Sequence, residues 1–237
     1  MAERERGGNQ VIPRPPTARP GPPAPWAHVP PDERHIDVER VVRGLRAAGP
    51  PKPSPWEPPT GSRQAAVLVP LFDEDGRAWV VLTRRSQHLR AHKGEVSFPG
   101  GRQDEGETLI EAALREAREE IALDTSGIEI VGELDHLATV SSNSSIVPFV
   151  GILPGRPTNL VPNPVEVEAV VIVSLDELAQ DDVFRTELWR WNPGAWPDRD
   201  DERPIHFFEL HGDTVWGATG RMLVNLLCIV FGVAHPG

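Results

Sequence analysis

Proline is distributed very unevenly along this chain, which limits where a packed core can form. Residues 1–60 contain 15 of the 26 prolines in the 237-residue sequence. Proline fixes φ and donates no backbone hydrogen bond, so such a stretch favours neither long helices nor central strands. Residues 1–34 also lack a core pattern, and the sequence predicts a disordered, proline-rich tail there. A partner-docking role for this tail is an alternative.

Residues 35–61 combine a short helix with a proline-rich linker. Apolar residues at i, i+3, i+4 and i+7 predict an amphipathic helix over residues 35–48, and they are Val38, Val41, Val42 and Leu45. The Gly49-Pro50 pair is a helix stop signal. The second proline-rich stretch, residues 50–59, connects this helix to the rest of the chain.

Residues 62–235 are predicted to form the folded domain, since the 39% hydrophobic content of the chain suffices for a core. A hairpin is expected from residues 65–71 and 78–83, with a turn at 73–76. Further strand-like segments are 128–140, 146–153, 165–173 and 205–210. Helical patterns cover residues 108–121, 174–180 and 218–230. Strands in the middle with helices around them predict an α+β or mixed α/β fold.

The overall charge and the single cysteine exclude several classes of protein. A net charge of -11 and a pI near 5.2 argue against general nucleic-acid binding, which needs a basic face. No apolar run approaches the ~20 residues of a membrane helix, and no secretory signal is visible. Cys228 lies in an apolar run and is predicted to be a small buried residue. These features favour a cytoplasmic protein with no membrane partner.

The most informative segment is an acidic helix near residues 107–122. Glu116 and Glu120 stand at i and i+4, with Glu119 beside them, so three carboxylates gather on one face. Such a cluster suits a hard divalent cation with oxygen ligands, and Arg115 is placed to orient Glu119. The alternative is an ordinary solvated helix face. The preceding Gly100-Gly101 pair favours the site, because glycine lets backbone approach a metal or phosphate closely.

The spacing of Gly101, Glu107, Arg115-Glu116 and Glu119-Glu120 resembles the Nudix box, G-x5-E-x7-R-E-U-x-E-E-x-G-U, where U is bulky and apolar. Two positions depart from it. Ala117 is small where the motif has its first U. Ala122 replaces the second glycine, which often takes the left-handed conformation after a helix; this conformation costs alanine ~1 kcal/mol.

The resemblance implies a Nudix-type α/β/α sandwich around a mixed sheet, and hydrolysis of a nucleoside diphosphate linked to another moiety. It implies Mg²⁺ or Mn²⁺ as cofactor. The implied metal ligands are Glu116, Glu119, Glu120 and a carbonyl of Gly100 or Gly101. Glu107 is then a structural box residue.

Residues 81–101 resemble the signature of the coenzyme A pyrophosphatase branch of this family, L-L-T-x-R-[S/A]-x3-R-x3-G-x3-F-P-G-G, with Val81 the only departure. Six of the ten residues 84–93 are Arg, Lys or His. We expect Arg85 and Arg90 to contact phosphate, because guanidinium binds it bidentately, with Gly101 also at the substrate. The alternative for each cation is an ion pair with an acidic residue or exposure to solvent.

The implied reaction is attack of water on the pyrophosphate of coenzyme A or acyl-CoA. The products are (acyl-)4′-phosphopantetheine and adenosine 3′,5′-bisphosphate. Glu119 and Glu166 are both candidates for the general base, with Arg115 assisting catalysis; His92 and His136 are weaker candidates.

Three further questions stay open in the sequence. The aromatic run 189–196 is predicted to pack a surface loop, with adenine stacking as the alternative. Other substrates to consider are ADP-ribose, nucleotide sugars and oxidised nucleotides, and a nucleotide-sensing module without activity is a second rival. The expected partner is a small nucleotide, and a homodimer is also open.

Overall fold

The computed structural model describes residues 6–54, 61–139, 143–190 and 202–235. Within them, eight strands form one mixed sheet whose main path runs β10-β4-β3-β9-β7. Its strands are β3 (Arg63–Glu74), β4 (Arg77–Arg85), β5 (Val96–Ser97), β6 (Gly100–Arg102), β7 (Glu129–Glu133), β8 (Leu137–Thr139), β9 (Ser144–Ile152) and β10 (Val167–Ser174).

A smaller sheet of the described residues has the order β14-β12-β11-β2. It consists of β2 (Arg19–Pro20), β11 (Phe184–Arg190), β12 (Glu202–Glu209) and β14 (Thr214–Val215). A separate parallel pair joins β1 (Gly7–Gly8) to β13 (His211–Gly212).

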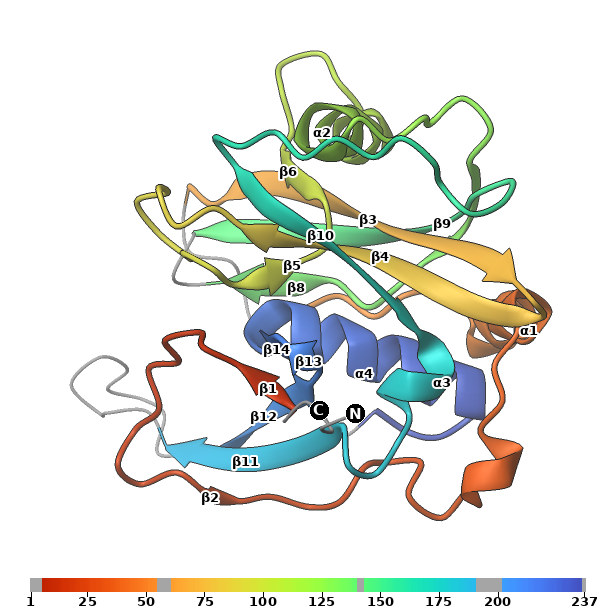
Figure 1. The fold of residues 1–237 in the computed structure, drawn as a ribbon, viewed down its shortest axis with the longest axis vertical. Coiled ribbons are helices and arrows are strands. Elements are labelled where there is room, and N and C mark those ends of the chain that lie inside the picture. The colour runs from red at the N-terminus through yellow and green to blue at the C-terminus, as the bar shows by residue number, and fades with distance from the viewer. Residues whose placement is uncertain (1–5, 55–60, 140–142, 191–201, 236–237) are drawn as a thin grey trace, which may run out of the picture.

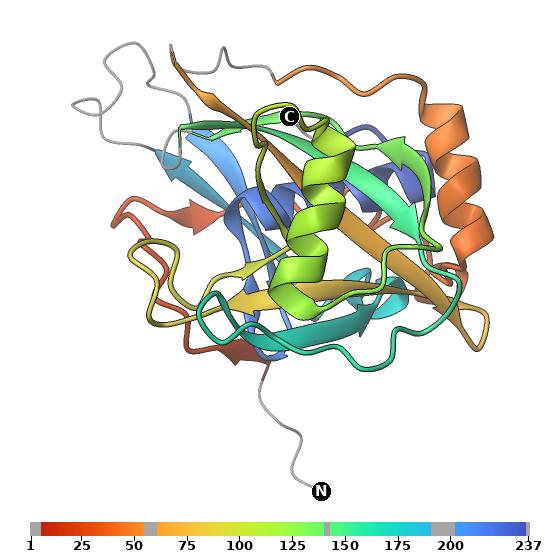
Figure 2. The same ribbon diagram turned by 90° about the horizontal axis from the view of Figure 1, so that it is seen from above.

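The helices divide the molecule into layers. They are α1 (Val38–Ala48), α2 (Leu109–Ile121), α3 (Leu175–Leu178) and α4 (Gly217–Phe231), with a 3-10 turn η1 at Pro31–Glu33. Helix α2 covers one face of the large sheet and α4 the other, with the small sheet beyond α4 (Figure 1). Viewed from above, α2 lies across the strands and α1 stands at the sheet edge (Figure 2). This confirms the α/β/α sandwich and adds a fourth layer to it. No helix of the described residues is long and apolar enough to cross a membrane.

The predicted hairpin forms the centre of the large sheet. Strands β3 and β4 pair antiparallel, and the chain turns at Asp75-Gly76, where both residues have positive φ. Strand β3 also pairs parallel with β9 over nine positions, from Arg63↔Ser144 to Leu71↔Ile152. A strand paired on both sides and covered on both faces needs a near-continuous apolar sequence, as residues 65–72 provide.

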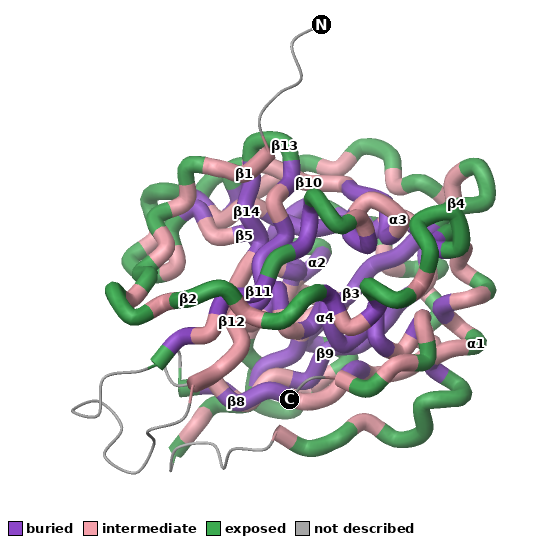
Figure 3. The backbone as a smooth tube through the Cα atoms, turned by 90° about the horizontal axis from the view of Figure 1, so that it is seen from below, coloured by how far each residue is buried: buried purple, intermediate pink, exposed green. Residues whose placement is uncertain are grey.

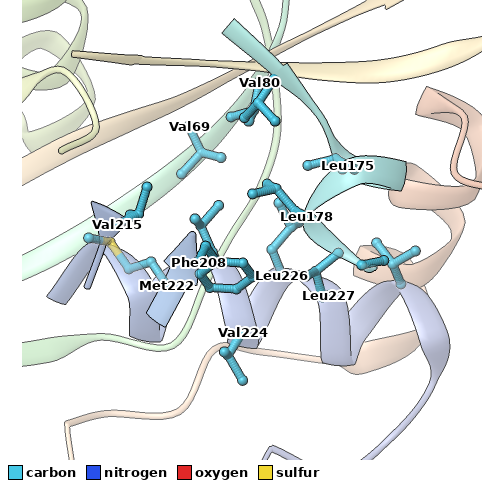
Figure 4. Packing of buried hydrophobic residues seen from close by; sticks show 14 of the residues in the cluster. Val69, Val80, Leu175, Leu178, Phe208, Val215, Met222, Val224, Leu226 and Leu227 are labelled. Atoms are coloured by element: carbon cyan, nitrogen blue, oxygen red, sulfur yellow. The ribbon is translucent and has the colours of Figure 1, made fainter. Parts of the chain in front are cut away.

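The two faces of this sheet are packed with different side chains. On the α4 face, Met222, Leu226 and Leu227 meet Val69 and Val80 in one large cluster (Figure 4). Cys228 is buried there, as predicted, and burial raises the pKa of its thiol to about 12. On the other face, α2 contributes mainly alanine to a smaller cluster, namely Ala112, Ala113 and Ala117. Small side chains let α2 lie close to the strands.

The expectation of a disordered tail is wrong for residues 6–34. The indole of Trp26 is fully buried and its Nε1 donates to the carbonyl of Ala179 at 3.0 Å. Arg34 is 1% exposed and also donates to Ala179 O, at 2.9 Å, and to Asp181 Oδ1, at 2.6 Å. Ala24, Trp26 and Arg34 are the buried residues of this segment, and its other residues are exposed or intermediate (Figure 3). Its prolines therefore accompany an extended segment that docks on the domain.

Two other predictions from the sequence need adjustment. The segment predicted as one strand over 128–140 is two strands, β7 and β8, separated at residues 134–136, and residue 140 lies outside the described residues. Strand β11 was not predicted, although it pairs with β12 over seven positions. The predicted helix over 108–121 is confirmed as α2, and the helix over 35–48 as α1.

Candidate active site

Helix α2 is fixed at both ends. At its start, Thr108 and Glu111 form a reciprocal capping box, with Thr108 N–H donating to Glu111 Oε2 at 2.8 Å. At its end, two backbone N–H groups of a distant loop donate to the last carbonyls of the helix: Val161 to Ile121 at 3.0 Å and Asn163 to Glu120 at 2.8 Å. The loop before β10 therefore lies against the carboxylate-bearing end of α2.

Arg115 connects the box carboxylates. Its Nε donates to Glu107 at 2.9 Å, and its Nη1 donates to Glu116 and Glu119, both at 3.0 Å. Nη2 donates to the carbonyl of Arg102 at 2.9 Å. The hydrogen bond from Arg115 is the main reason why the pKa of Glu107 lies below its usual range. The predicted contact between Arg115 and Glu119 is confirmed, and Glu107 holds the guanidinium from the other side.

Glu120 is the most deeply buried carboxylate of the helix. It is 3% exposed, and its Oε2 has no hydrogen-bond partner among the described residues. Burial raises the pKa of Glu120 to about 8, against the opposing charge of Arg85; Glu116 and Glu166 raise it further, and the Gly100 N–H lowers it through a hydrogen bond. These four neighbours place Glu120 at the centre of the site.

Glu166 also faces the box from outside it. Burial raises the pKa of Glu116 above its usual value despite the hydrogen bond from Arg115, and the charges of Glu119 and Glu166 raise it further. The charges of Glu116 and Glu166 both act on Glu120, so these three carboxylates lie within electrostatic range of one another.

The glycine pair is required by close contacts. Gly100 has φ 154°, and a Cβ there would lie 2.4 Å from the carbonyl oxygen of Ala66. A Cβ on Gly101 would lie 2.3 Å from Glu116 Oε1. Any side chain at either position would therefore displace β3 or the Glu116 carboxylate.

The donor set fits a divalent cation in its chemistry, although the carboxylates do not form a compact cluster. No three acidic, histidine or cysteine side chains among the described residues are grouped closely enough to hold an ion. Glu119 is 55% exposed, and both it and Glu116 are engaged by Arg115. The unpartnered buried oxygen of Glu120 is the feature that fits, because such an oxygen is costly unless a cation or donor meets it. Carboxylate oxygens are the ligands that Mg²⁺ and Mn²⁺ prefer.

The predicted basic segment divides into paired and unpaired cations. Arg84 donates to both oxygens of buried Asp213 at 3.1 Å, and His92 pairs with Glu95 at 3.0 Å. The Arg85 side chain, by contrast, makes no hydrogen bond to the described residues, and its Nε is buried. Arg90 is exposed in the loop that follows β4. Arg85 and Arg90 therefore remain available to an anionic ligand.

Asn163 was missed by sequence reasoning, although it organises the loop that carries Glu166. Its carbonyl accepts from the Glu166 N–H at 3.0 Å, and its own N–H binds α2. The Glu166 carbonyl in turn accepts from Ser86 N at 2.8 Å, next to Arg85. The proline on each side of Asn163 was the available signal of a rigid loop.

The weaker candidates lie elsewhere or are engaged. His136 pairs with Glu133 at 2.9 Å, at the end of β7, which is an edge strand of the large sheet. Trp189 is 1% exposed and packs against Phe207 and Trp216 at 6.0 and 6.1 Å between ring centroids. Packing is therefore confirmed for Trp189, and residues 191–196 of the aromatic run lie outside the described residues.

Known proteins resemble this chain over the region that contains the site. Nudix hydrolase 3 of Caenorhabditis elegans is 47% identical over 175 residues, which are 70% of this chain and 72% of that protein. Nudix hydrolase 22, chloroplastic, of Arabidopsis thaliana is 37% identical over 71% of this chain and 56% of its own length. A Nudix hydrolase called NudL from Pectobacterium atrosepticum is 34% identical over 73% of this chain and 86% of its own length.

Among solved structures, a MutT/nudix family protein from Enterococcus faecalis aligns with 81% of this chain and 68% of its own, at 15% identity and a TM-score of 0.47. The model of the NUDIX domain matches residues 62–195, more than half of the sequence, including α2 and both glycines. The chain therefore belongs to the Nudix hydrolase family, whose members act on pyrophosphate bonds of nucleoside diphosphate derivatives.

Proposed function

We propose that this Nudix hydrolase cleaves the pyrophosphate of coenzyme A or acyl-CoA. The observation that carries the proposal is the basic loop after β4, which begins at Arg85 beside the carboxylates of α2. Coenzyme A has a 3′-phosphate besides its pyrophosphate, so it needs cations next to the metal-binding carboxylates. Arg85 and Arg90 are available for this role, whereas Arg84 and His92 are not.

The metal ligands in this proposal are Glu116, Glu119, Glu120 and the carbonyl of Gly100. A bound Mg²⁺ or Mn²⁺ supplies charge neutralisation of the pyrophosphate and activation of water. Arg115 orients Glu119 and Glu116 from the side of Glu107. Gly101 lets the pyrophosphate approach the backbone, since any side chain there would reach the Glu116 carboxylate.

Glu166 is our proposed general base, in preference to Glu119. Its loop is fixed to α2 and to Ser86 by backbone hydrogen bonds, so the backbone of Glu166 is held beside the box carboxylates. Glu119 is engaged by Arg115 and is suited to metal binding. The base takes a proton from the attacking water, and the products are (acyl-)4′-phosphopantetheine and adenosine 3′,5′-bisphosphate.

A substrate panel with Mg²⁺ or Mn²⁺ tests the proposal. We expect the largest kcat/KM for coenzyme A or an acyl-CoA, with adenosine 3′,5′-bisphosphate as product by chromatography. Cleavage of ADP-ribose, a nucleotide sugar or an oxidised nucleotide with no cleavage of coenzyme A would reject the substrate. Binding without turnover of any of them would favour a nucleotide-sensing module.

The choice of base is tested separately. Glu166→Gln should lower kcat by about 100-fold or more and remove the acidic limb of the pH–rate profile. If the limb persists in Glu166→Gln and is lost in Glu119→Gln, Glu119 is the base.

A further inference from the structure

Exposed apolar side chains are rare on this protein, and two of them lie beside the site. The described residues include four large exposed hydrophobic side chains: Val11, Ile110, Val161 and Val165. Val161 is 62% exposed and Val165 is 69% exposed. Both belong to the loop of residues 160–166 before β10, which carries Glu166 and is hydrogen-bonded to the end of α2. We call Val161 and Val165 the apolar ledge.

The ledge is held in place by its backbone. Val161 N–H donates to Ile121 O at 3.0 Å, and Val165 N–H donates to the Asn163 side-chain oxygen at 3.2 Å. Asn163 is itself bound to Glu120 through its N–H. A loop fixed by this many hydrogen bonds has a defined surface, so the exposure of its valines does not come from loose attachment. Ligand sites combine apolar side chains with a few placed polar groups, so two exposed valines in the loop that carries Glu166 suit contact with an apolar part of the substrate.

One backbone hydrogen bond joins the loop that carries the ledge to the basic loop. The carbonyl of Glu166 accepts from Ser86 N at 2.8 Å, so the ledge loop ends where the basic loop of residues 86–93 begins. Arg90 and Lys93 are exposed on the basic side. The site is thus polar and cationic on one flank and apolar on the other.

We propose that this asymmetry orients the substrate, with the apolar ledge contacting the pantetheine and acyl arm and the basic loop contacting the 3′-phosphate of the nucleotide half. The inference rests on the proposed function, because coenzyme A carries these two chemistries on opposite sides of its pyrophosphate. A longer acyl chain then gains affinity at Val161 and Val165. The ledge is a specificity determinant and takes no part in the chemical step.

The test compares three substrates in two variants. For Val161→Ser/Val165→Ser, we expect kcat/KM for octanoyl-CoA to fall about 10-fold relative to kcat/KM for coenzyme A, since a methylene in an apolar pocket is worth about that much. For Arg90→Ala, we expect kcat/KM for coenzyme A to fall about 10-fold relative to dephospho-coenzyme A, with the acyl preference unchanged. Val11→Ser is the matched control, because it removes another exposed valine, 92% exposed, from the N-terminal segment.

Three results would overturn the inference. An equal fall for all three substrates in the ledge variant would show that the loop only positions Glu166. If the ledge variant keeps the wild-type substrate preference but differs from wild type in molar mass by light scattering, a second copy of the chain covers the ledge. If the ledge variant lowers the ratio of kcat/KM for coenzyme A to kcat/KM for dephospho-coenzyme A, the ledge contacts the 3′-phosphate half, and the substrate lies in the opposite orientation. If wild-type protein cleaves no coenzyme A derivative, the proposed function itself fails, and this result is distinct from the other three.

Discussion

The two faces of the large sheet differ in how their most deeply buried charged residue is partnered. On the α4 face, the most deeply buried charge, Arg34, donates to three backbone carbonyls and to Asp181. On the α2 face, Glu120 is buried to a similar extent and leaves one oxygen without a partner. A buried polar atom without a partner costs about 1–3 kcal/mol, and more when charged. Glu120 on the α2 face therefore keeps a cost that a ligand can remove, whereas Arg34 on the α4 face is already satisfied by partners within the protein.

Substitutions on the two faces should therefore differ in their effects. Changes near α2 should alter activity more than stability, and changes near α4 should alter stability more than activity. Each of the following predictions tests one side of this difference.

The largest effect is expected for Glu119→Gln. Removing one carboxylate from the proposed metal set should lower kcat/KM by about 1000-fold, because preorganised charge at the reacting phosphate is lost. Its free energy of unfolding should change by less than about 0.5 kcal/mol, since its side chain is 55% exposed. Glu105→Gln, in the exposed turn before α2, is the control and should keep wild-type activity. Retention of a tenth of the activity in Glu119→Gln would remove it from the site.

The opposite result is expected for Trp26→Ala on the α4 face. It empties a fully buried site next to Phe184 and Phe231, whose rings lie 5.0 and 6.0 Å away, so the free energy of unfolding should fall by about 3 kcal/mol. Urea denaturation measures the loss. At a temperature where the variant is folded, its kcat/KM should equal that of wild type. A wild-type midpoint in urea would mean that the N-terminal segment does not dock in solution.

The difference between the faces also explains what the sequence could predict. The α2 site was visible because its residues lie within one segment: the helix repeat fixes which carboxylates share a face, and the glycine spacing fixes the entrance. The docked N-terminal segment was hidden because Trp26 meets Ala179, 153 positions away, and no local pattern encodes such a contact. Its prolines indicated disorder, although they only exclude regular structure. Asn163 was missed for the same reason, since its partner is on another element.

Glu120→Gln should stabilise the protein while it inactivates it. The folded-state pKa of Glu120, about 8, lies above the unfolded value, so stability is lost as pH rises from about 4.5 through 8. With chelator at pH 8, the Gln variant should therefore gain up to about 4 kcal/mol in the free energy of unfolding over wild type. The gain should be almost absent at pH 5. An equal gain at both pH values would show that the carboxylate charge is not its cause.

His206 on the α4 side predicts the reverse pH dependence. Burial lowers its pKa to about 4, with His235 and Arg221 adding to the effect. Below about pH 6.5 the imidazole of His206 is protonated in the unfolded state and still neutral in the folded state. Stability is therefore lost as pH falls from 6.5 towards 4. Between pH 7 and 5, wild type should lose about 2 kcal/mol more than His206→Gln in urea denaturation. Parallel losses in both proteins would exclude His206 as the cause.

The smallest effect concerns Ala122, where the box motif has glycine. Ala122 ends α2 in the left-handed conformation, with φ 54° and ψ 32°. This conformation costs an L-residue ~1 kcal/mol, but glycine loses ~0.4–1 kcal/mol more entropy on folding. Ala122→Gly should therefore raise the free energy of unfolding by only about 0.5 kcal/mol, the difference between these two effects.

The control is Ala47→Gly, which is exposed in the right-handed helix α1 and should lower the free energy of unfolding by about 0.5–1 kcal/mol. Opposite signs for the two variants would show that Ala122 is strained. Equal losses would show that the chain has adapted to alanine at this position. Activity should be unchanged in Ala122→Gly, because the loop before β10 binds the Ile121 carbonyl through Val161 and needs no glycine at position 122 to do so. A change in kcat would mean that the strain at the helix exit helps to set the position of Glu166.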